Sequence, residues 1–379
     1  MKVFIAGGGP AGLYAAYLIK KRRPAAAITL VEQNPAGATF GFGVVFSDKA
    51  LDFLRDDDPE THALVTPAME TWTDLTINHR GEEICIDGIG FAAIGRLKLL
   101  KLLQQRLASV GVTPRYETTM REPPDPADYD LIIAADGVNS IIRAAHAEFG
   151  TTISPLANKF IWYGTTKTFA TLTQTFVRTR DGHFNAHHYR YAADMSTFLV
   201  ECDAPTWQRT GFAGMSEADT RQVCETIFAA TLDGHPLVTN RSLWRNFPNV
   251  WNDRWHHRNM VLVGDALRTA HFSIGTGTRL ALEDVIALVR ALDANGFDVA
   301  NALPAYQAAR RPVVEKLVGA ANASAAWYES FPQHMELPPW DFAWSYIQRS
   351  GRIDPEKLRS VAPHFVAGYE ASRGKKALA

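Results

Sequence analysis

The chain has 379 residues, of which 46% are hydrophobic and 11% aromatic, so it is long enough to bury a large core in two or three structural units. Its formal net charge of -1 gives no electrostatic basis for nucleic-acid binding. It has neither an apolar run of about twenty residues nor a leader-like N-terminus. We therefore expect a soluble, cytoplasmic monomer or homodimer with no membrane contact. Three scattered cysteines without CxxC spacing exclude a disulfide framework, a cysteine zinc site and a redox-active dithiol, and no metal site is expected.

The N-terminal residues have the pattern of a strand, a glycine turn and a helix. Gly7, Gly9 and Gly12 form GxGxxG, the helix opens at Ala11, and Glu32 closes the next strand. In this arrangement Gly7 makes the turn, Gly9 lets a pyrophosphate approach, Gly12 allows close helix packing, and Glu32 accepts ribose hydroxyls. An acidic residue there disfavours a phosphorylated ribose, so the pattern favours FAD or NAD over NADP. The elements are expected over 2–6, 11–22 and 27–32.

Loop, strand and helix patterns alternate through the rest of the chain. A helix with the capping-box pattern Ser216 to Asp219 interrupts a stretch rich in strands. The expected elements are a loop over 35–44, a hairpin turning at 79–81, a helix over 96–107, a strand over 112–118, a strand-rich stretch over 158–247 and a helix over 303–327 that Pro312 should kink or divide.

Two further strand ends carry an aspartate and glycines. In DLIIAADGVNSIIR, residues 130–143, Asp136 ends a buried strand, although an Asx-capped turn with Arg143 at the surface would explain this segment equally well. Near 260–284, Asp265 ends an apolar strand and a glycine loop opens a helix. Free N–H groups at that helix start favour an anionic group, such as a reduced flavin ring. The loop residues concerned are Gly275, Thr276, Gly277 and Thr278.

Together, GxGxxG, DGxxSxxR and GDA followed by GxGT resemble the three-part signature of the class A flavoprotein monooxygenases, which share the p-hydroxybenzoate hydroxylase-like fold. The resemblance implies that Asp136 contributes to the pyrophosphate contacts of FAD and NAD(P)H and that Asp265 binds the ribityl or ribose part. Gly43 and Val44 are further cofactor candidates. Arg96 would also reach the cofactor, although an exposed arginine at a helix start would look the same.

The fold implied by this resemblance is mixed α/β. It combines a Rossmann-like FAD-binding domain with an inserted β-rich substrate domain and a helical C-terminal region. The FAD-binding domain is expected in 1–71, 96–153 and 255–300, the β-rich domain in 72–95 and 154–254, and the helical region in 301–379.

The activity implied by the resemblance is aromatic hydroxylation. In this family NADH or NADPH reduces FAD, and one oxygen atom of O2 passes through a flavin C4a-hydroperoxide to an activated aromatic ring. The chain has no second GxGxxG unit for a nicotinamide domain, which disfavours disulfide-reductase-like enzymes and monooxygenases with two dinucleotide domains. An FAD-binding reductase or another non-oxygenase flavoprotein stays open as the alternative of a different class.

Departures from the wider family pattern point to one branch. The family usually has His and Pro where this chain has Arg268 and Phe272. The chain resembles the salicylyl-CoA 5-hydroxylase and anthraniloyl-CoA monooxygenase group, and in part the violacein-pathway hydroxylase. An aryl-CoA thioester is therefore the expected substrate, with a carrier-bound aromatic group or a free indole compound as alternatives. The segments that carry the resemblance are 40–48, 90–96, 159–165, 196–201 and 342–353.

Two histidines are candidate catalytic residues. His271 lies inside the cofactor loop, where it could act as an acid, a base or a hydrogen-bond donor, or could only fix the loop. His187 alternates with Tyr189 in one expected strand, so both side chains share a face. Candidates for the wall of the substrate cavity, against the simpler alternative of core packing, are His187, Tyr189, Trp162 and Phe247, with Phe272 as a further substrate contact.

Overall fold

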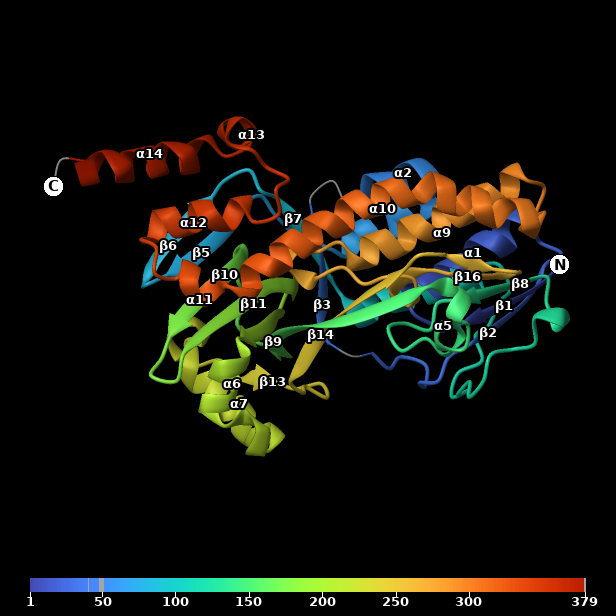
Figure 1. Ribbon diagram of the computed structural model, residues 1–379, viewed down its shortest axis with the longest axis horizontal. Helices are drawn as coiled ribbons and strands as arrows, with labels where there is room; N and C mark the ends of the chain where they lie inside the picture. The colour runs from blue at the N-terminus through green and yellow to red at the C-terminus, as the bar shows by residue number, and fades with distance from the viewer. Residues whose placement is uncertain (40, 48–50, 378–379) are drawn as a thin grey trace.

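A parallel sheet forms the end of the molecule that holds the N-terminus in the computed structural model, which describes residues 1–39, 41–47 and 51–377 (Figure 1). The strands pair in the order β15-β16-β8-β1-β2, with only the β15 edge antiparallel. Strands β1, β8 and β16 are buried almost throughout, so they are continuous apolar runs without alternation. Their bounds are β1 Lys2–Ala6, β2 Ala27–Val31, β8 Leu131–Ala134, β15 His256–His257 and β16 Met260–Leu262.

Long helices pack beside this sheet. The first helix, α1, contacts both α4 and α9, and α9 packs along α10. Figure 1 shows α10 running from above the parallel sheet to the other half of the molecule. The expected division at Pro312 is wrong: one helix continues through Pro304 and Pro312, because Tyr306, Val314 and Val318 bury its apolar side on both sides of the prolines. The helices are α1 Pro10–Arg22, α4 Arg96–Ala108, α9 Gly277–Ala294 and α10 Val299–Glu329.

A large, mostly antiparallel sheet occupies the other half. Its order is β13-β9-β12-β11-β10-β5-β6, and β14 pairs with β9. The expected hairpin is confirmed: β5 and β6 turn at Arg80 and Gly81, whose φ angles of 55° and 79° suit a tight two-residue turn. The strands are β5 Leu75–His79, β6 Glu82–Ile86, β9 Thr151–Thr165, β10 Leu172–Arg178, β11 His183–Ala192, β12 Met195–Cys202, β13 Leu237–Val238 and β14 Arg245–Asn252.

A small antiparallel sheet, β3-β7-β4, places Gly43 and Val44 opposite Gly95 and Ile94, just before α4 begins. The loop expected over 35–44 therefore ends early, because Gly43 already starts β3. Past α10, α12 and α14 pack on the β5–β6 hairpin. The bounds are β3 Gly43–Ser47, β4 Glu70–Trp72, β7 Phe91–Gly95, α11 Phe331–His334, α12 Pro339–Gln348, α13 Pro355–Val361 and α14 Pro363–Ala377.

The strand expected over 112–118 is wrong. This segment runs along β2 and forms only an isolated bridge, between Val31 and Arg115. Pro114 lacks an N–H group, and Glu117 has a left-handed φ of 52°, so pairing cannot continue. The expected capping box is confirmed in α7, where Ser216 Oγ accepts from the Asp219 N–H at 3.2 Å. The remaining helices are α2 Asp52–Asp57, α3 Pro59–Val65, α5 Ile141–Ala144, α6 Ala204–Thr210, α7 Glu217–Ile227 and α8 Ala229–Leu232.

The mixed α/β fold is thus confirmed, while the expected domain boundaries stay a prediction. Within the described ranges, the helices lack the combination of length and apolar character that crossing a bilayer requires.

Candidate active site

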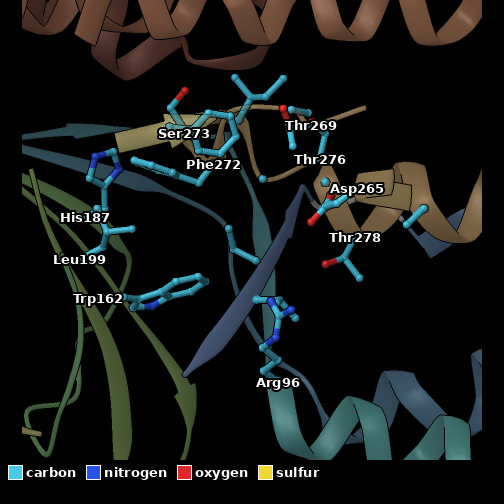
Figure 2. A pocket seen from close by; sticks show the side chains of 18 of the residues that line it. Arg96, Trp162, His187, Leu199, Asp265, Thr269, Phe272, Ser273, Thr276 and Thr278 are labelled. Atoms are coloured by element: carbon cyan, nitrogen blue, oxygen red, sulfur yellow. The ribbon is translucent and has the colours of Figure 1, made fainter. Parts of the chain in front are cut away.

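A cavity of about 660 Å³ lies where the loops after the parallel strands meet the small and the large sheet (Figure 2). The volume is in the range of small-molecule sites. At one end its wall is formed by glycine loops and the first residues of α1 and α9, and at the other by aromatic side chains from the large sheet and the loop before α9. Of the sequence-predicted residues, those on the wall are Gly9, Ala11, Gly43, Val44, Arg96, Trp162, His187, Tyr189, Phe247, Asp265, Phe272, Gly275, Thr276, Gly277 and Thr278.

The first glycine motif is shaped by close backbone contacts. A Cβ on Gly12 would lie 1.9 Å from the carbonyl oxygen of Gly7, so only glycine lets α1 start this close to β1. Gly7 makes the turn with a left-handed φ of +98°, and it does not line the cavity. A Cβ on Gly9 would meet no atom within 4 Å, which leaves open space at the start of α1. The motif therefore presents a helix N-terminus to an unobstructed part of the cavity.

Glu32 and Asp136 lie behind the wall. The carboxylate of Glu32 accepts from the Gly8 N–H at 2.7 Å and the Asn34 N–H at 2.8 Å, beside the first motif. Asp136 Oδ2 accepts from the Ile141 N–H at 2.8 Å, and burial raises the pKa of this carboxyl. Neither residue lines the cavity, so their cofactor roles stay predictions.

Arg143 is buried, which excludes the surface position that the simpler interpretation of its motif required. Its guanidinium donates to the carbonyl of Ala266 at 3.0 Å and to that of Val138. Arg143 therefore ties the loop of the second motif to the loop of the third.

The third motif brings Asp265 and the start of α9 to the same end of the cavity. Figure 2 shows Arg96 reaching from α4 toward the space between Trp162 and Asp265. Burial lowers the pKa of Arg96 and raises that of Asp265, and the opposite charge of each side chain counters these shifts. Gly275 has φ +61°, and a Cβ there would lie 3.1 Å from the carbonyl oxygen of Val45. Glycine is thus favoured where the loop crosses β3.

A buried ionic network holds this loop against α9 and α10. Arg268, which is 1% exposed, donates to Asp284 at 2.5 Å and to the carbonyl of Gly264 at 3.2 Å. Arg310 on α10 also donates to Asp284, at 2.9 Å, and to Glu283. Arg268 therefore has a structural role here, which its departure from the family pattern did not reveal.

The aromatic end of the cavity is built from one face of the large sheet. Leu199 pairs in register with both Trp162 and His187, and His187 also pairs with Gln174, so side chains from four strands form one row. Phe272 completes the wall from the opposite side and contacts the ring of His187 edge-on, at 5.3 Å between centroids. The alternation of His187 and Tyr189 predicted this shared face, and core packing alone does not explain these residues.

His187 forms a buried pair with Glu201 on β12. Its Nε2 atom lies 3.2 Å from Glu201 Oε2, and Glu201 Oε1 accepts from Asn158 Nδ2 at 2.9 Å. Burial lowers the pKa of His187 to about 3 and raises that of Glu201. The ring of His187 therefore faces the cavity uncharged near neutral pH.

His271 lies behind Phe272 and does not line the cavity. Its Nδ1 atom is 2.8 Å from Ser273 Oγ, which in turn lies 2.7 Å from Ser324 Oγ on α10. The side chain also caps the short helix Phe272–Ile274. This geometry supports the alternative in which His271 fixes the loop, and a catalytic role for it stays a prediction.

Acid should destabilise the protein through its buried histidines. Burial lowers the pKa of His187 and His188 to about 3 and that of His271 to about 4. Neutral histidine stabilises the folded state above the unfolded pKa of about 6.5, and this stability is lost as the pH falls toward the folded pKa.

At pH ~5 we expect each of these histidines to lower the free energy of unfolding by roughly 2 kcal/mol relative to pH ~7. Protonation of Glu201, whose pKa is raised in the folded state, offsets part of this loss. Urea unfolding followed by tryptophan fluorescence at the two pH values measures the loss. Equal midpoints would contradict the neutral, buried state of these rings.

Sequence reasoning missed several polar residues of this site, among them Glu201, Gln174 and Arg349. Glu201 shares a strand face with Leu199 and Thr197, so the alternation in STFLVEC could have indicated it. Gln174 and Arg349 line the cavity, and Arg349 lies within 342–353, a segment that carries the family resemblance, but no local pattern marks either residue as part of a site. Tertiary pairing alone brings these two residues to the site.

Two kinds of observation test whether FAD fits the glycine-rich end. The starts of α1 and α9 both border the cavity, and the backbone N–H groups of helix starts favour phosphate and anionic rings. Thr276 Oγ1, on the cavity wall, is buried without a hydrogen-bond partner among the described residues, which leaves a polar atom for a ligand. The residues present fit the cofactor.

Comparison with known proteins gives the same assignment. The FAD binding domain family matches residues 1–321. Salicyloyl-CoA 5-hydroxylase of a Streptomyces species is 40% identical over 361 residues, which cover 92% of this chain and 70% of that protein. The 3-hydroxy-4-methyl-anthranilyl-(aryl-carrier protein) 5-monooxygenase of Streptosporangium sibiricum is 37% identical, over 88% of this chain and 90% of that one.

A third relative and a solved structure extend the comparison. Protodeoxyviolaceinate monooxygenase of Chromobacterium violaceum is 34% identical over 94% of this chain and 96% of that protein. The structure of 2-methyl-3-hydroxypyridine-5-carboxylic acid oxygenase shares the fold, with a TM-score of 0.71 and 16% identity over 95% of this chain and 96% of that chain. The resemblance drawn from the three motifs is confirmed. The chain therefore belongs to the FAD binding domain family, among relatives that are aromatic monooxygenases.

Proposed function

We propose that this FAD-dependent aromatic monooxygenase uses NADH or NADPH and O2 to insert one oxygen atom into the ring of an aryl thioester. Salicyloyl-CoA and anthraniloyl-CoA are the first candidates. The observation that carries the proposal is the cavity itself, whose aromatic end continues directly into its glycine-rich end. Relatives at 40% and 37% identity are named for a CoA-linked and a carrier-linked aromatic substrate. We further infer a cytoplasmic monomer or homodimer.

The chain's own residues would position the cofactor and the ring. The N-terminus of α1 at Gly9 would hold the pyrophosphate of FAD, and residues 275–278 would face the flavin. Bound FAD would supply the electrons taken from the nicotinamide and the activated oxygen. Trp162 and Phe272 would enclose the substrate ring and keep water from the reacting atoms.

A product analysis with isotopically labelled O2 tests this function. The purified protein is supplied with NADH or NADPH and with matched substrates: salicyloyl-CoA, anthraniloyl-CoA, the same acyl groups on a carrier protein, the free acids and an indole compound. We expect one labelled oxygen atom in the aryl ring of a thioester. Product from a free acid or an indole alone would refute the thioester assignment, and NAD(P)H oxidation without any oxygenated product would indicate a reductase.

Replacing His187 with glutamine should lower hydroxylation while FAD stays bound. The histidine lies on the cavity wall, stacked on Tyr328 at 4.9 Å, where it can orient the ring through a hydrogen bond. Loss of one such contact, or of a proton-transferring group, lowers kcat/KM by about 10²-fold. The measurement is product formation per bound flavin.

His188 provides the matched control, because it is equally buried but lies on the opposite face of β11. Its Nε2 atom is 2.9 Å from Thr175 Oγ1, and its ring stacks on Phe198. His188→Gln should lower stability and leave the turnover of the folded enzyme close to wild type. Equal turnover of both variants would remove His187 from the reaction.

A further inference from the structure

Arg349 follows α12 and lines the aromatic end of the cavity. One of its terminal nitrogens donates to the carbonyl of Tyr346 at 2.8 Å, and the other donates to the carbonyl of Ser273 at 2.9 Å. The guanidinium also lies over the ring of Tyr346, 3.7 Å from its centroid. These contacts fix the position of the group, but all of them come from neutral partners.

The positive charge of Arg349 is not balanced within the protein. Among the described residues no carboxylate lies within 4.0 Å of its nitrogens, and its Nε–H is buried without an acceptor. Glu201, the acidic side chain paired with His187 behind this wall, is also bonded to Asn158, and burial raises its pKa, which favours the neutral form. A cation at the wall of an apolar cavity is costly unless something pairs with it.

Arg245, an exposed cation, also lines the cavity, and the other polar groups beside Arg349 are neutral. Burial lowers the pKa of His187 and His271 far enough to keep both rings uncharged near neutral pH, and it raises the pKa of Tyr328. Gln174 accepts from the Tyr328 hydroxyl through Oε1, at 3.2 Å, which leaves its amide N–H groups available to a ligand. The site thus offers a cation and neutral donors, a combination that suits an anionic oxygen.

We propose that Arg349 binds the ionised hydroxyl oxygen of a hydroxyaryl substrate, so that the ring is held as a phenolate and its proton is left in bulk water. This inference rests on the proposed function and narrows its substrate class. A phenolate pushes electron density into the ring positions that an electrophilic oxygen attacks. An amino-substituted ring offers no anion to Arg349, so salicyloyl thioesters are preferred over anthraniloyl thioesters.

Fluorine NMR of bound ligands tests this subsite without turnover. The FAD-loaded enzyme, without NAD(P)H, is mixed with 5-fluorosalicyloyl-CoA or with 4-fluorophenol, whose chemical shifts report ionisation of the hydroxyl. A close cation lowers the pKa of an acid by about 1–3 units, so the bound ionisation equilibrium should shift 10- to 1,000-fold toward phenolate. Arg349→Gln should abolish the shift, and Arg349→Lys should keep part of it.

Arg352→Gln is the matched control, because this exposed arginine lies three residues further on and does not line the cavity. It should bind both ligands like wild type. A phenol form bound to wild type, or an unchanged phenolate form bound to Arg349→Gln, would overturn the subsite, as would failure of wild type to bind either ligand. Phenolate binding of 4-fluorophenol without binding of the thioester would support the subsite and refute the thioester proposal.

Discussion

Replacing Asp284 with alanine should lower the free energy of unfolding by about 3–5 kcal/mol, because it leaves buried charges without a partner. Asp284 is fully buried and accepts from Arg268 at 2.5 Å and from Arg310 at 2.9 Å. Arg268 also holds the carbonyl of Gly264, so the loop that carries Asp265 should loosen and FAD should bind more weakly. Chemical denaturation measures the first effect, and titration of the apoprotein with FAD measures the second.

Asp293→Ala is the control for this variant, because it removes an aspartate from the same helix. Asp293 pairs with Arg22 at 2.7 Å, but their side chains are 37% and 51% exposed. Such a surface pair contributes about 0–1 kcal/mol. If Asp284→Ala were no more destabilising than Asp293→Ala, the network would not stabilise the loop as described.

Replacing Gly12 with alanine should destabilise the protein by about 3 kcal/mol or more and abolish FAD binding. The added Cβ would lie 1.9 Å from the backbone oxygen of Gly7, a contact that only a shift of α1 away from β1 can relieve. That shift would move the helix N-terminus from the cavity wall. The thermal midpoint and the flavin absorbance of the purified variant report the two effects.

Substitutions of two other glycines distinguish an effect on folding from an effect on FAD binding. Gly319→Ala places a Cβ in open space on α10 and should be neutral or stabilise by up to about 1 kcal/mol. Gly9→Ala is equally unobstructed within the protein, yet it would fill the space assigned to the pyrophosphate. A Gly9→Ala variant that folds normally and binds FAD as tightly as wild type would count against that assignment.

The parts of the fold that could be predicted from the sequence rest on local patterns. The first strand, the glycine turn and α1 follow from an apolar run and glycines at fixed spacing, and the β5–β6 hairpin follows from alternation around Arg80 and Gly81. The small sheet could not be predicted, because β3, β7 and β4 are short strands that pair across long separations. Pro312 was misleading because packing on both sides of it outweighs its local cost.

The residues of the candidate site also differ in whether a local sequence pattern indicates them. Glycine motifs indicated the cofactor end, since the spacing of the glycines after each strand is a local signal in the sequence. The pairing of His187 with Glu201 and the position of Arg349 depend on strand register and on where α12 packs, which no local pattern encodes. The role of Arg268 likewise depends on Asp284, which lies further along the chain, inside α9.

We propose that an aryl thioester bound in the aromatic end of the cavity accelerates reduction of a flavin held at the glycine-rich end. The most direct measurement is the rate at which NADH or NADPH bleaches the flavin absorbance under anaerobic conditions, with and without salicyloyl-CoA. We expect a yellow protein whose flavin absorbance bleaches much faster when the thioester is present. The same rate with and without every aryl thioester, or a protein that binds no flavin, would contradict it.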